Sequence, residues 1–185
     1  MGVSVAVDTK GVELARYERL LDTLGRHDYK AELLDSIGAV VESQTRRRIA
    51  EEKTTPDGQK WQPWSESYGK TRHENQSLLQ SEGALLDSIE FQVERSRVRV
   101  GSALIYSRVH QYGFSGTVRV PAHIRRISQA FGKALKFPVY QSVGAFSRQV
   151  DTPARTYLGL SSDNKTELLA VIGDFWADVM AEAGL

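Results

Sequence analysis

Residues that could carry out chemistry are few in this chain and lie far apart. Its four histidines, His27, His73, His110 and His123, fall in four separate segments. No two of them have the i, i+4 spacing that places two metal ligands on one helix face. The chain has no cysteine, so disulfides, zinc–cysteine sites and thiol nucleophiles are excluded. The sequence therefore predicts no metal site.

Motifs for covalent catalysis and for nucleotide binding are missing as well. Gly113-Phe114-Ser115-Gly116 is one residue short of the Gly-x-Ser-x-Gly elbow that exposes a catalytic serine. The chain has neither a phosphate-binding glycine loop followed by Lys-Ser/Thr nor a dinucleotide fingerprint. His110 has no carboxylate or nucleophile beside it in the sequence, so we interpret it as a structural histidine. These absences predict a protein that is not an enzyme and binds no cofactor.

The chain does have a basic middle segment between two acidic ends. Residues 91–151 carry ten basic and two acidic side chains, residues 1–90 carry 12 and 16, and residues 152–185 carry two and five. This division, hidden by a net charge of +1, indicates a surface that meets a polyanion or an acidic neighbour, with a solvated surface as the alternative. The candidates to face DNA or an acidic partner are Arg119, Arg125, Arg126, Lys133, Lys136 and Arg148.

Three helices, each with one apolar side, are expected to support this segment. The first covers residues 9–24. The second begins at Asp28 and ends at the arginine run 46–48, whose charge complements the negative end of a helix or is simply solvated; contact with nucleic acid is the alternative. The third is capped by residues 161–163 and has an apolar side on which we expect Trp176 to join the core.

A small sheet is expected beside these helices. Alternation at residues 3–7 predicts a short strand. A helical turn at residues 83–87 leads into a strand at 88–94, whose hairpin partner includes residues 98–100. A further short helix is expected at 103–112.

Two tryptophans follow a strong turn signal at residues 53–58. Trp61 and Trp64 lie in a loop, and tryptophans in a loop usually attach it to a core because each buries a large apolar area. A contact between subunits is the alternative role.

Residues 114–152 are expected to form an arm. They show no helical period, contain three glycines and two prolines, and alternate at 117–120 and 138–143, which predicts extended β-structure. The predicted fold is therefore α+β, with helices packed on a small antiparallel sheet and a long extended β-arm. Residues 1–113 and 153–185 together would form the one domain, and residues 114–152 the inserted basic arm.

Five short motifs, taken in order, carry a resemblance to a known family. They are Pro56 to Ser65, Leu79 to Ile89, Val98 to Ser102, Tyr106 to Gly113 and Pro153 to Ser161. In this order and spacing the chain resembles the phage virion morphogenesis, or tail-completion, family of Mu-like tailed phages. The family's Pro-Ala-Arg-Pro-Phe run appears here as Pro153-Ala154-Arg155-Thr156-Tyr157.

The resemblance implies an α+β fold, no enzymatic activity, and a structural role at the head–tail joint or the upper end of the tail, in a ring that commonly has six subunits. We therefore expect a homo-oligomeric ring subunit of the virion, at the neck or tail end, whose partners are its own copies and neighbouring neck and tail proteins. The arm could reach a neighbour and pair with its strand edge. The subunit-contact candidates are Arg155, Tyr157, Phe131, Phe137 and Tyr140.

The chain is expected to be made in the host cytoplasm and to avoid the membrane. Its N-terminus lacks the pattern of a secretory signal, and no stretch approaches the roughly 20 apolar residues that span a bilayer.

Two other functions stay open from the sequence. The chain could be a transient capsid or tail assembly factor that is not retained in the virion. It could also be a sequence-independent nucleic-acid-binding domain that contacts phosphates only, and a ring could likewise hold double-stranded DNA in its lumen in this way. The basic segment lacks the interleaved aromatic residues expected for single-strand binding.

Overall fold

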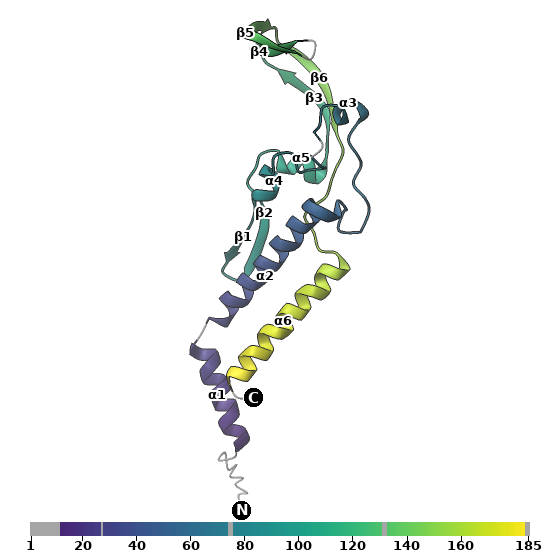
Figure 1. Ribbon diagram of the computed structural model, residues 1–185. Helices are drawn as coiled ribbons and strands as arrows, with labels where there is room; N and C mark the ends of the chain where they lie inside the picture. The colour runs from purple at the N-terminus through teal and green to yellow at the C-terminus, as the bar shows by residue number, and fades with distance from the viewer. Residues whose placement is uncertain (1–11, 27, 74–75, 131–132, 184–185) are drawn as a thin grey trace, which may run out of the picture.

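The computed structural model describes residues 12–26, 28–73, 76–130 and 133–183. The molecule is elongated: helices and a β-hairpin form the body, and a narrow arm of strands projects from one end (Figure 1). Helices and small antiparallel sheets occur together, which confirms the α+β class. The strand expected at residues 3–7 lies outside the described residues.

The central element of the body is α2, Tyr29–Arg47. Asp28 caps it, because its carboxylate accepts a hydrogen bond from the N–H of Ala31 at 3.1 Å. Figure 1 shows the hairpin of β1 (Ile89–Glu94) and β2 (Arg97–Ser102) on one side of α2, and α6 (Ser162–Glu182) on the other. The helix start at Asp28 is therefore confirmed.

The α-helix α2 ends at Arg47, within the arginine run 46–48, as predicted. One turn of π-helix, η1 (Arg48–Glu52), continues it and ends where Lys53 adopts a left-handed φ of 55°. The Lys53 ammonium donates to the carbonyls of Ile49 and Leu78. The contact with Leu78 joins this end of the helix to a segment 25 residues further along the chain.

The hairpin beside α2 follows the prediction for residues 83–100. A short helix, α4 (Ala84–Asp87), leads into β1 (Ile89–Glu94), which pairs antiparallel with β2 (Arg97–Ser102). The hairpin lies very close to α2: a Cβ atom on Gly38 would be 2.7 Å from Phe91 Cγ. A glycine is therefore required where helix and strand cross.

Helix α6, Ser162–Glu182, begins with a capping box. The Ser161 hydroxyl accepts from the Asn164 N–H at 3.0 Å, and Asn164 Oδ1 accepts from the Ser161 N–H at 3.2 Å. The predicted cap is thus confirmed, but the expected core position of Trp176 is wrong, because its side chain is 43% exposed. Helix α6 packs along α2 and also contacts α1 (Val12–Arg26), and its Leu169, Trp176 and Met180 remain exposed.

Helix α1, Val12–Arg26, is a second helix with uncovered apolar residues. Leu21 and Leu24 are both exposed, although helical spacing predicts an apolar side. No helix among the described residues has the length and apolar character needed to cross a bilayer.

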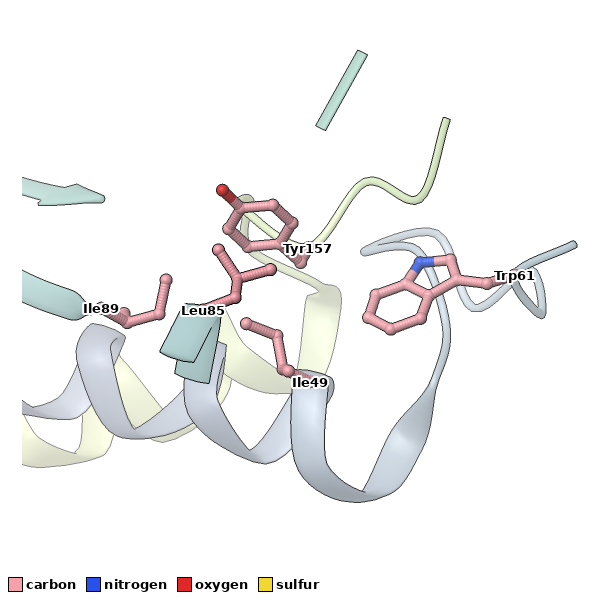
Figure 2. Packing of buried hydrophobic residues seen from close by; sticks show 5 residues of the cluster. All are labelled: Ile49, Trp61, Leu85, Ile89 and Tyr157. Atoms are coloured by element: carbon pink, nitrogen blue, oxygen red, sulfur yellow. The ribbon is translucent and has the colours of Figure 1, made fainter. Parts of the chain in front are cut away.

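The core lies where η1, α4, β1 and the segment before α6 meet. Ile49, Trp61, Leu85, Ile89 and Tyr157 form its buried cluster (Figure 2). The Trp61 indole also donates from Nε1 to a backbone carbonyl of that segment at 3.1 Å. The prediction that tryptophan attaches the loop to the core is therefore confirmed for Trp61. The same loop contains a one-turn helix, α3 (Glu66–Gly69).

The arm begins after α5, Ser107–Tyr112, which starts four residues later than predicted. Strand β3 (Phe114–Val120) pairs antiparallel with β6 (Phe146–Thr152), and β4 (His123–Ala130) pairs with β5 (Lys133–Val143). The arm is thus two successive two-stranded ribbons (Figure 1). This confirms extended β-structure across the described part of residues 114–152.

Candidate assembly interface

The half of the arm next to the body, β3–β6, has one apolar and one polar face. Val120 lies opposite Phe146 and Val118 opposite Arg148, and directly opposite residues share a face. The mainly apolar face contains Phe114, Val118, Val120, Phe146 and Val150 together with Gly116, Arg148 and Thr152, and the polar face contains Ser115, Thr117, Arg119, Ser147, Gln149 and Asp151. Both phenylalanines are exposed, so the subunit leaves part of this apolar face uncovered.

The tip of the arm, β4–β5, exposes large apolar side chains next to arginine. Ile124, Phe137 and Tyr140 are 73%, 71% and 66% exposed. Arg126 lies directly opposite Tyr140, and Ile124 precedes Arg126 by two residues on the same strand. Ile124, Arg126 and Tyr140 therefore share one face, which we call the tip face. The register shifts between Ile127 and Gln129, so the tip face ends there.

The structure brings four of the six basic candidates to the tip. Arg125 and Arg126 lie on β4, and Lys133 and Lys136 on β5, whereas Arg119 and Arg148 lie on opposite faces of β3–β6. All six are exposed. Within the described residues, none of the six forms an ion pair. Their charge is uncompensated in this part of the single subunit.

Both ends of the arm are held to the body at one place. Gly113 starts the arm with φ of 76°, and a Cβ on it would lie 2.9 Å from the backbone N of Ala154. The Gln111 Oε1 accepts from the N–H groups of Tyr157 and Leu158, both at 3.0 Å, and its Nε2 donates to the Leu158 carbonyl at 3.2 Å. Gln111 therefore orients the base of the arm.

Arg155, a subunit-contact candidate, is turned into the body. Its Nε donates to the Gln62 carbonyl at 3.0 Å and its Nη2 to the Pro63 carbonyl at 3.2 Å. Its own N–H donates to the His110 carbonyl at 2.7 Å. The side chain is buried, so it links the tryptophan loop to the base of the arm.

Replacing Arg155 with alanine should lower the free energy of unfolding by about 1–2 kcal/mol, because two carbonyls lose a charged donor. We also expect the destabilisation to be greatest near the substitution. The rate of amide hydrogen exchange should increase more in the loop 59–69 than in α2. Exchange measured by mass spectrometry on both proteins checks this, and uniform quickening across the body would contradict it.

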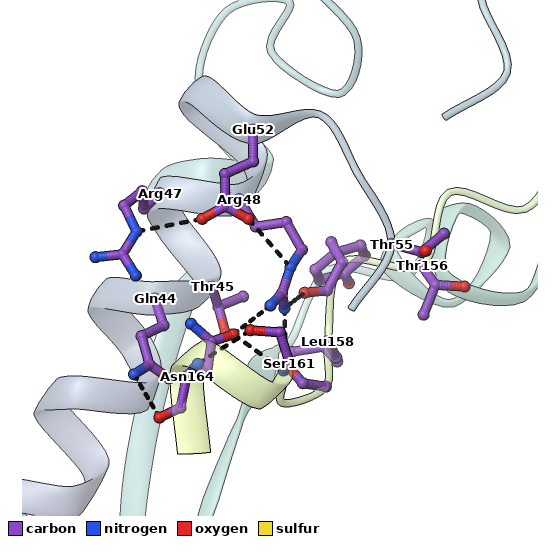
Figure 3. Close-up of polar contacts among 12 residues, drawn as sticks. Gln44, Thr45, Arg47, Arg48, Glu52, Thr55, Thr156, Leu158, Ser161 and Asn164 are labelled. Carbon is purple, nitrogen blue, oxygen red and sulfur yellow. Dashed lines mark hydrogen bonds and ion pairs between the residues drawn. The ribbon is translucent and has the colours of Figure 1, made fainter. Parts of the chain in front are cut away.

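The arginine run 46–48 is structural. Arg46 donates to the Ile89 carbonyl at 2.8 Å, and Arg47 bonds Glu167 at 3.1 Å. Arg48 is buried, and Figure 3 shows its guanidinium among the residues that precede and begin α6. Arg48 is the C-cap residue of α2, and because its side chain is buried it is neither solvated nor placed to contact nucleic acid.

The Arg48 guanidinium bonds three groups of the segment that returns from the arm. Its Nη1 donates to the carbonyls of Tyr157 at 2.9 Å and Gly159 at 2.7 Å, and its Nη2 donates to Asn164 Oδ1. Burial lowers the pKa of this guanidinium, while the nearby Glu52 carboxylate opposes that shift. Arg48 therefore fixes the position of the chain between the arm and α6.

The aromatic contact candidates divide between core and surface. Tyr157 is 1% exposed, so in the folded subunit it belongs to the core, and we replace its assignment as a surface contact. Phe137 and Tyr140 lie exposed on the tip. Phe131 lies outside the described residues.

A cavity of about 980 Å³ opens beside the base of the arm. Its walls include Trp64, Tyr68, Arg72, His110 and Arg155, and the Arg72 guanidinium lies 4.4 Å from the centre of the Tyr68 ring. Burial, and second the charge of Arg155, lower the pKa of His110, so its imidazole is neutral at pH 7. No group of three His, Asp or Glu residues suited to a metal ion occurs in the part of the chain that the structure describes.

Sequence reasoning missed the two polar centres at Arg48 and Gln111. Gln111 bonds a group 46 residues away in the sequence, and Arg48 bonds one 116 residues away. Hydrophobic periodicity does not signal such contacts. The only local indication was that Gln111 and Arg155 lie inside two of the five motifs.

Comparison with known proteins points to one group. The sequence model of the phage virion morphogenesis family matches residues 9–175. The "Putative capsid assembly protein G" of Escherichia phage Mu is 24% identical to this chain over 176 residues, which are 93% of this chain and 92% of that protein. No solved structure matches the chain significantly. Because the family match spans most of its length, the chain belongs to the phage virion morphogenesis family.

Proposed function

We propose that this chain is a non-enzymatic structural subunit at the neck or upper tail end of a tailed-phage virion, where copies of it, most simply six, form a ring. Membership of the family gives a role in phage morphogenesis. The observation that supports the finer assignment is the projecting arm, with its exposed apolar residues and uncompensated basic charge. An exposed apolar ribbon with free strand edges is a surface made for association.

The position of the arm suits a head-to-tail contact between copies, the kind of contact from which a ring is built. The arm lies at one end of the elongated body and α6 extends toward the other end (Figure 1). A contact between an arm and the body of a second copy joins two different surfaces, which generates a closed ring when the rotation between copies is suitable.

Two kinds of partner could neutralise the basic residues of the arm. Double-stranded DNA in a ring lumen presents about one negative charge per 1.7 Å of its axis. Adjoining protein surfaces with exposed carboxylates are the other partner. DNA contact would make binding fall steeply as salt rises, so a gel-shift series against salt distinguishes the two.

Deleting residues 114–152 should abolish assembly and leave the body folded. Gly113 lies against Ala154, so a short glycine–serine linker can close the chain, and the core cluster contains no arm residue. We expect native mass spectrometry to show a ring for the full chain and a monomer for the deletion. A phage carrying the deletion should yield no infectious particles.

The control for the deletion is Gln149→Ala on the polar face of β6, which should assemble and support infection as the parent does. A deletion protein that still forms the parental ring would contradict the proposal, and so would a full chain that is a monomer at all concentrations.

A second candidate function is a transient assembly factor, and the name of the phage Mu relative, a putative capsid assembly protein, favours it. Counting the chain in purified virions by quantitative mass spectrometry separates the two. Several copies per particle support the ring subunit, and absence from particles supports the transient factor.

A further inference from the structure

Helix α6 carries an exposed apolar stripe on the side that faces away from α2. Leu169, Gly173, Trp176 and Met180 follow one another at intervals of four, three and four residues, so they lie along one side of the helix. The three large side chains are 68%, 43% and 40% exposed. We call these four residues the α6 stripe.

Four acidic residues form a line along α6, and two alanines separate this acidic line from the stripe. Asp163, Glu167, Asp174 and Asp178 share this side of the helix and are exposed. Glu167 bonds Arg47 of α2, but Asp174 and Asp178 form no ion pair within the described residues. The small exposed residues between stripe and line, Ala170 and Ala177, let another backbone approach.

The tip face of the arm complements this surface. Ile124 and Tyr140 offer exposed apolar side chains on this face, and Arg126 lies beside both, whereas Arg125 is on the other face of the ribbon. A ribbon laid over the alanines could therefore place Ile124 and Tyr140 against the stripe and Arg126 against Asp174 and Asp178. Opposite charges arranged in this way set orientation and exclude wrong partners.

Geometry and charge indicate that the arm docking on this surface belongs to another copy of the chain. The tip lies at the far end of the molecule from the C-terminal end of α6 (Figure 1), so a subunit's own arm points away from its own stripe. Two α6 helices meeting each other would bring two acidic lines together, which like-charge repulsion disfavours. The arm of another copy carries the missing positive charge.

We propose that the tip face of one copy docks across the α6 stripe and acidic line of the next copy, and that this contact, repeated, closes the ring. The inference rests on the proposed ring and names the surfaces that build it. It also accounts for the exposure of Trp176 and for the uncompensated charge at the tip.

Cysteine cross-linking tests the contact directly, because the chain has no cysteine of its own. Ser142→Cys lies on the tip face, opposite Ile124, and Ala177→Cys lies beside the stripe; neither removes a side chain that the docking needs. A mixture of the two single variants, treated with a short bismaleimide, should give a covalent two-chain product. The double variant should give a ladder that ends at the size of the ring.

The control pairs Ser142→Cys with Glu66→Cys, whose side chain is 85% exposed on α3. Rings of normal mass in which the 142–177 mixture cross-links no better than this control would overturn the docking and leave the proposed ring intact. A chain that never assembles would overturn both.

Charge reversal gives a second, independent readout. Arg126→Glu and Asp174→Lys should each raise the concentration at half-assembly about tenfold, and a chain carrying both changes should return to within about threefold of the parent. Arg97→Glu, the same charge change on exposed β2, should have little effect. Failure of the double variant to recover would count against the pairing of tip and acidic line.

Discussion

Replacing Arg48 with methionine should lower the free energy of unfolding by about 3–5 kcal/mol, because three acceptors lose their charged donor and each buried group left unsatisfied costs about 1–3 kcal/mol. Methionine fills similar space but donates no hydrogen bond. It leaves the carbonyls of Tyr157 and Gly159 and the amide oxygen of Asn164 without their donor. Urea unfolding followed by tryptophan fluorescence, to which buried Trp61 contributes, measures the loss, together with soluble yield if the variant fails to fold.

The matched control is Arg47→Met, one position earlier on the same helix. Arg47 forms ion pairs with Glu52 and Glu167, but its side chain is 41% exposed, and exposed ion pairs contribute about 0–1 kcal/mol. We expect the two substitutions to differ by roughly 2 kcal/mol or more. Equal losses would show that Arg48 does not hold the segment before α6.

A consequence of the Arg48 contacts is that the arm and α6 are positioned from one centre. The chain leaves the body at Gly113, returns at Ala154, and then passes Gln111 and Arg48 before α6 begins. In the proposed ring the arm and α6 are the two docking surfaces. Their relative orientation therefore depends on a few buried polar contacts rather than on a large core.

Elements with local signals could be predicted from the sequence. The cap at Asp28 and the capping box at Ser161 are side-chain-to-backbone contacts within four residues. The alternation that predicted the hairpin and the arm is also local, with period two. These parts of the fold needed no knowledge of distant residues.

The register and faces of the arm could not be predicted. Phe114 pairs with Thr152, and Val120 with Phe146, so each pairing joins residues tens of positions apart. Because a slip of one residue exchanges the two faces of a strand, alternation alone could not say which side of the ribbon is apolar. The candidate residues at the tip were chosen for their charge and aromaticity, and the sequence did not show which face of the ribbon each of them lies on.

The error at Trp176 has a different physical origin. Helical periodicity shows which side of α6 is apolar, but it does not show whether an element of the same subunit covers that side. Val179 is buried, whereas Trp176 three residues earlier is exposed. The apolar arc of α6 is therefore wider than α2 can cover. This uncovered arc is the surface on which we propose that the tip of another copy docks.

Gly38→Ala should lower the free energy of unfolding by about 2–3 kcal/mol, although alanine is the better helix former. The added Cβ would lie 2.7 Å from Phe91 Cγ, so the ring or the whole β1–β2 hairpin must move away from α2. Such overpacking costs more than the gain of about 1 kcal/mol in helix propensity. Chemical denaturation of the two proteins at equal concentration measures the difference.

The same substitution at Gly173 of α6 is the control with the opposite sign. No described atom lies within 4 Å of the position of its Cβ, so Gly173→Ala should raise stability by about 0.5–1 kcal/mol. In a chain that already carries Phe91→Ala, Gly38→Ala should lower the free energy of unfolding by less than it does in the parent, because the smaller side chain at position 91 removes the clash. If Gly38→Ala and Gly173→Ala changed the free energy of unfolding by the same amount, the close crossing of α2 and β1 would not explain the glycine at position 38.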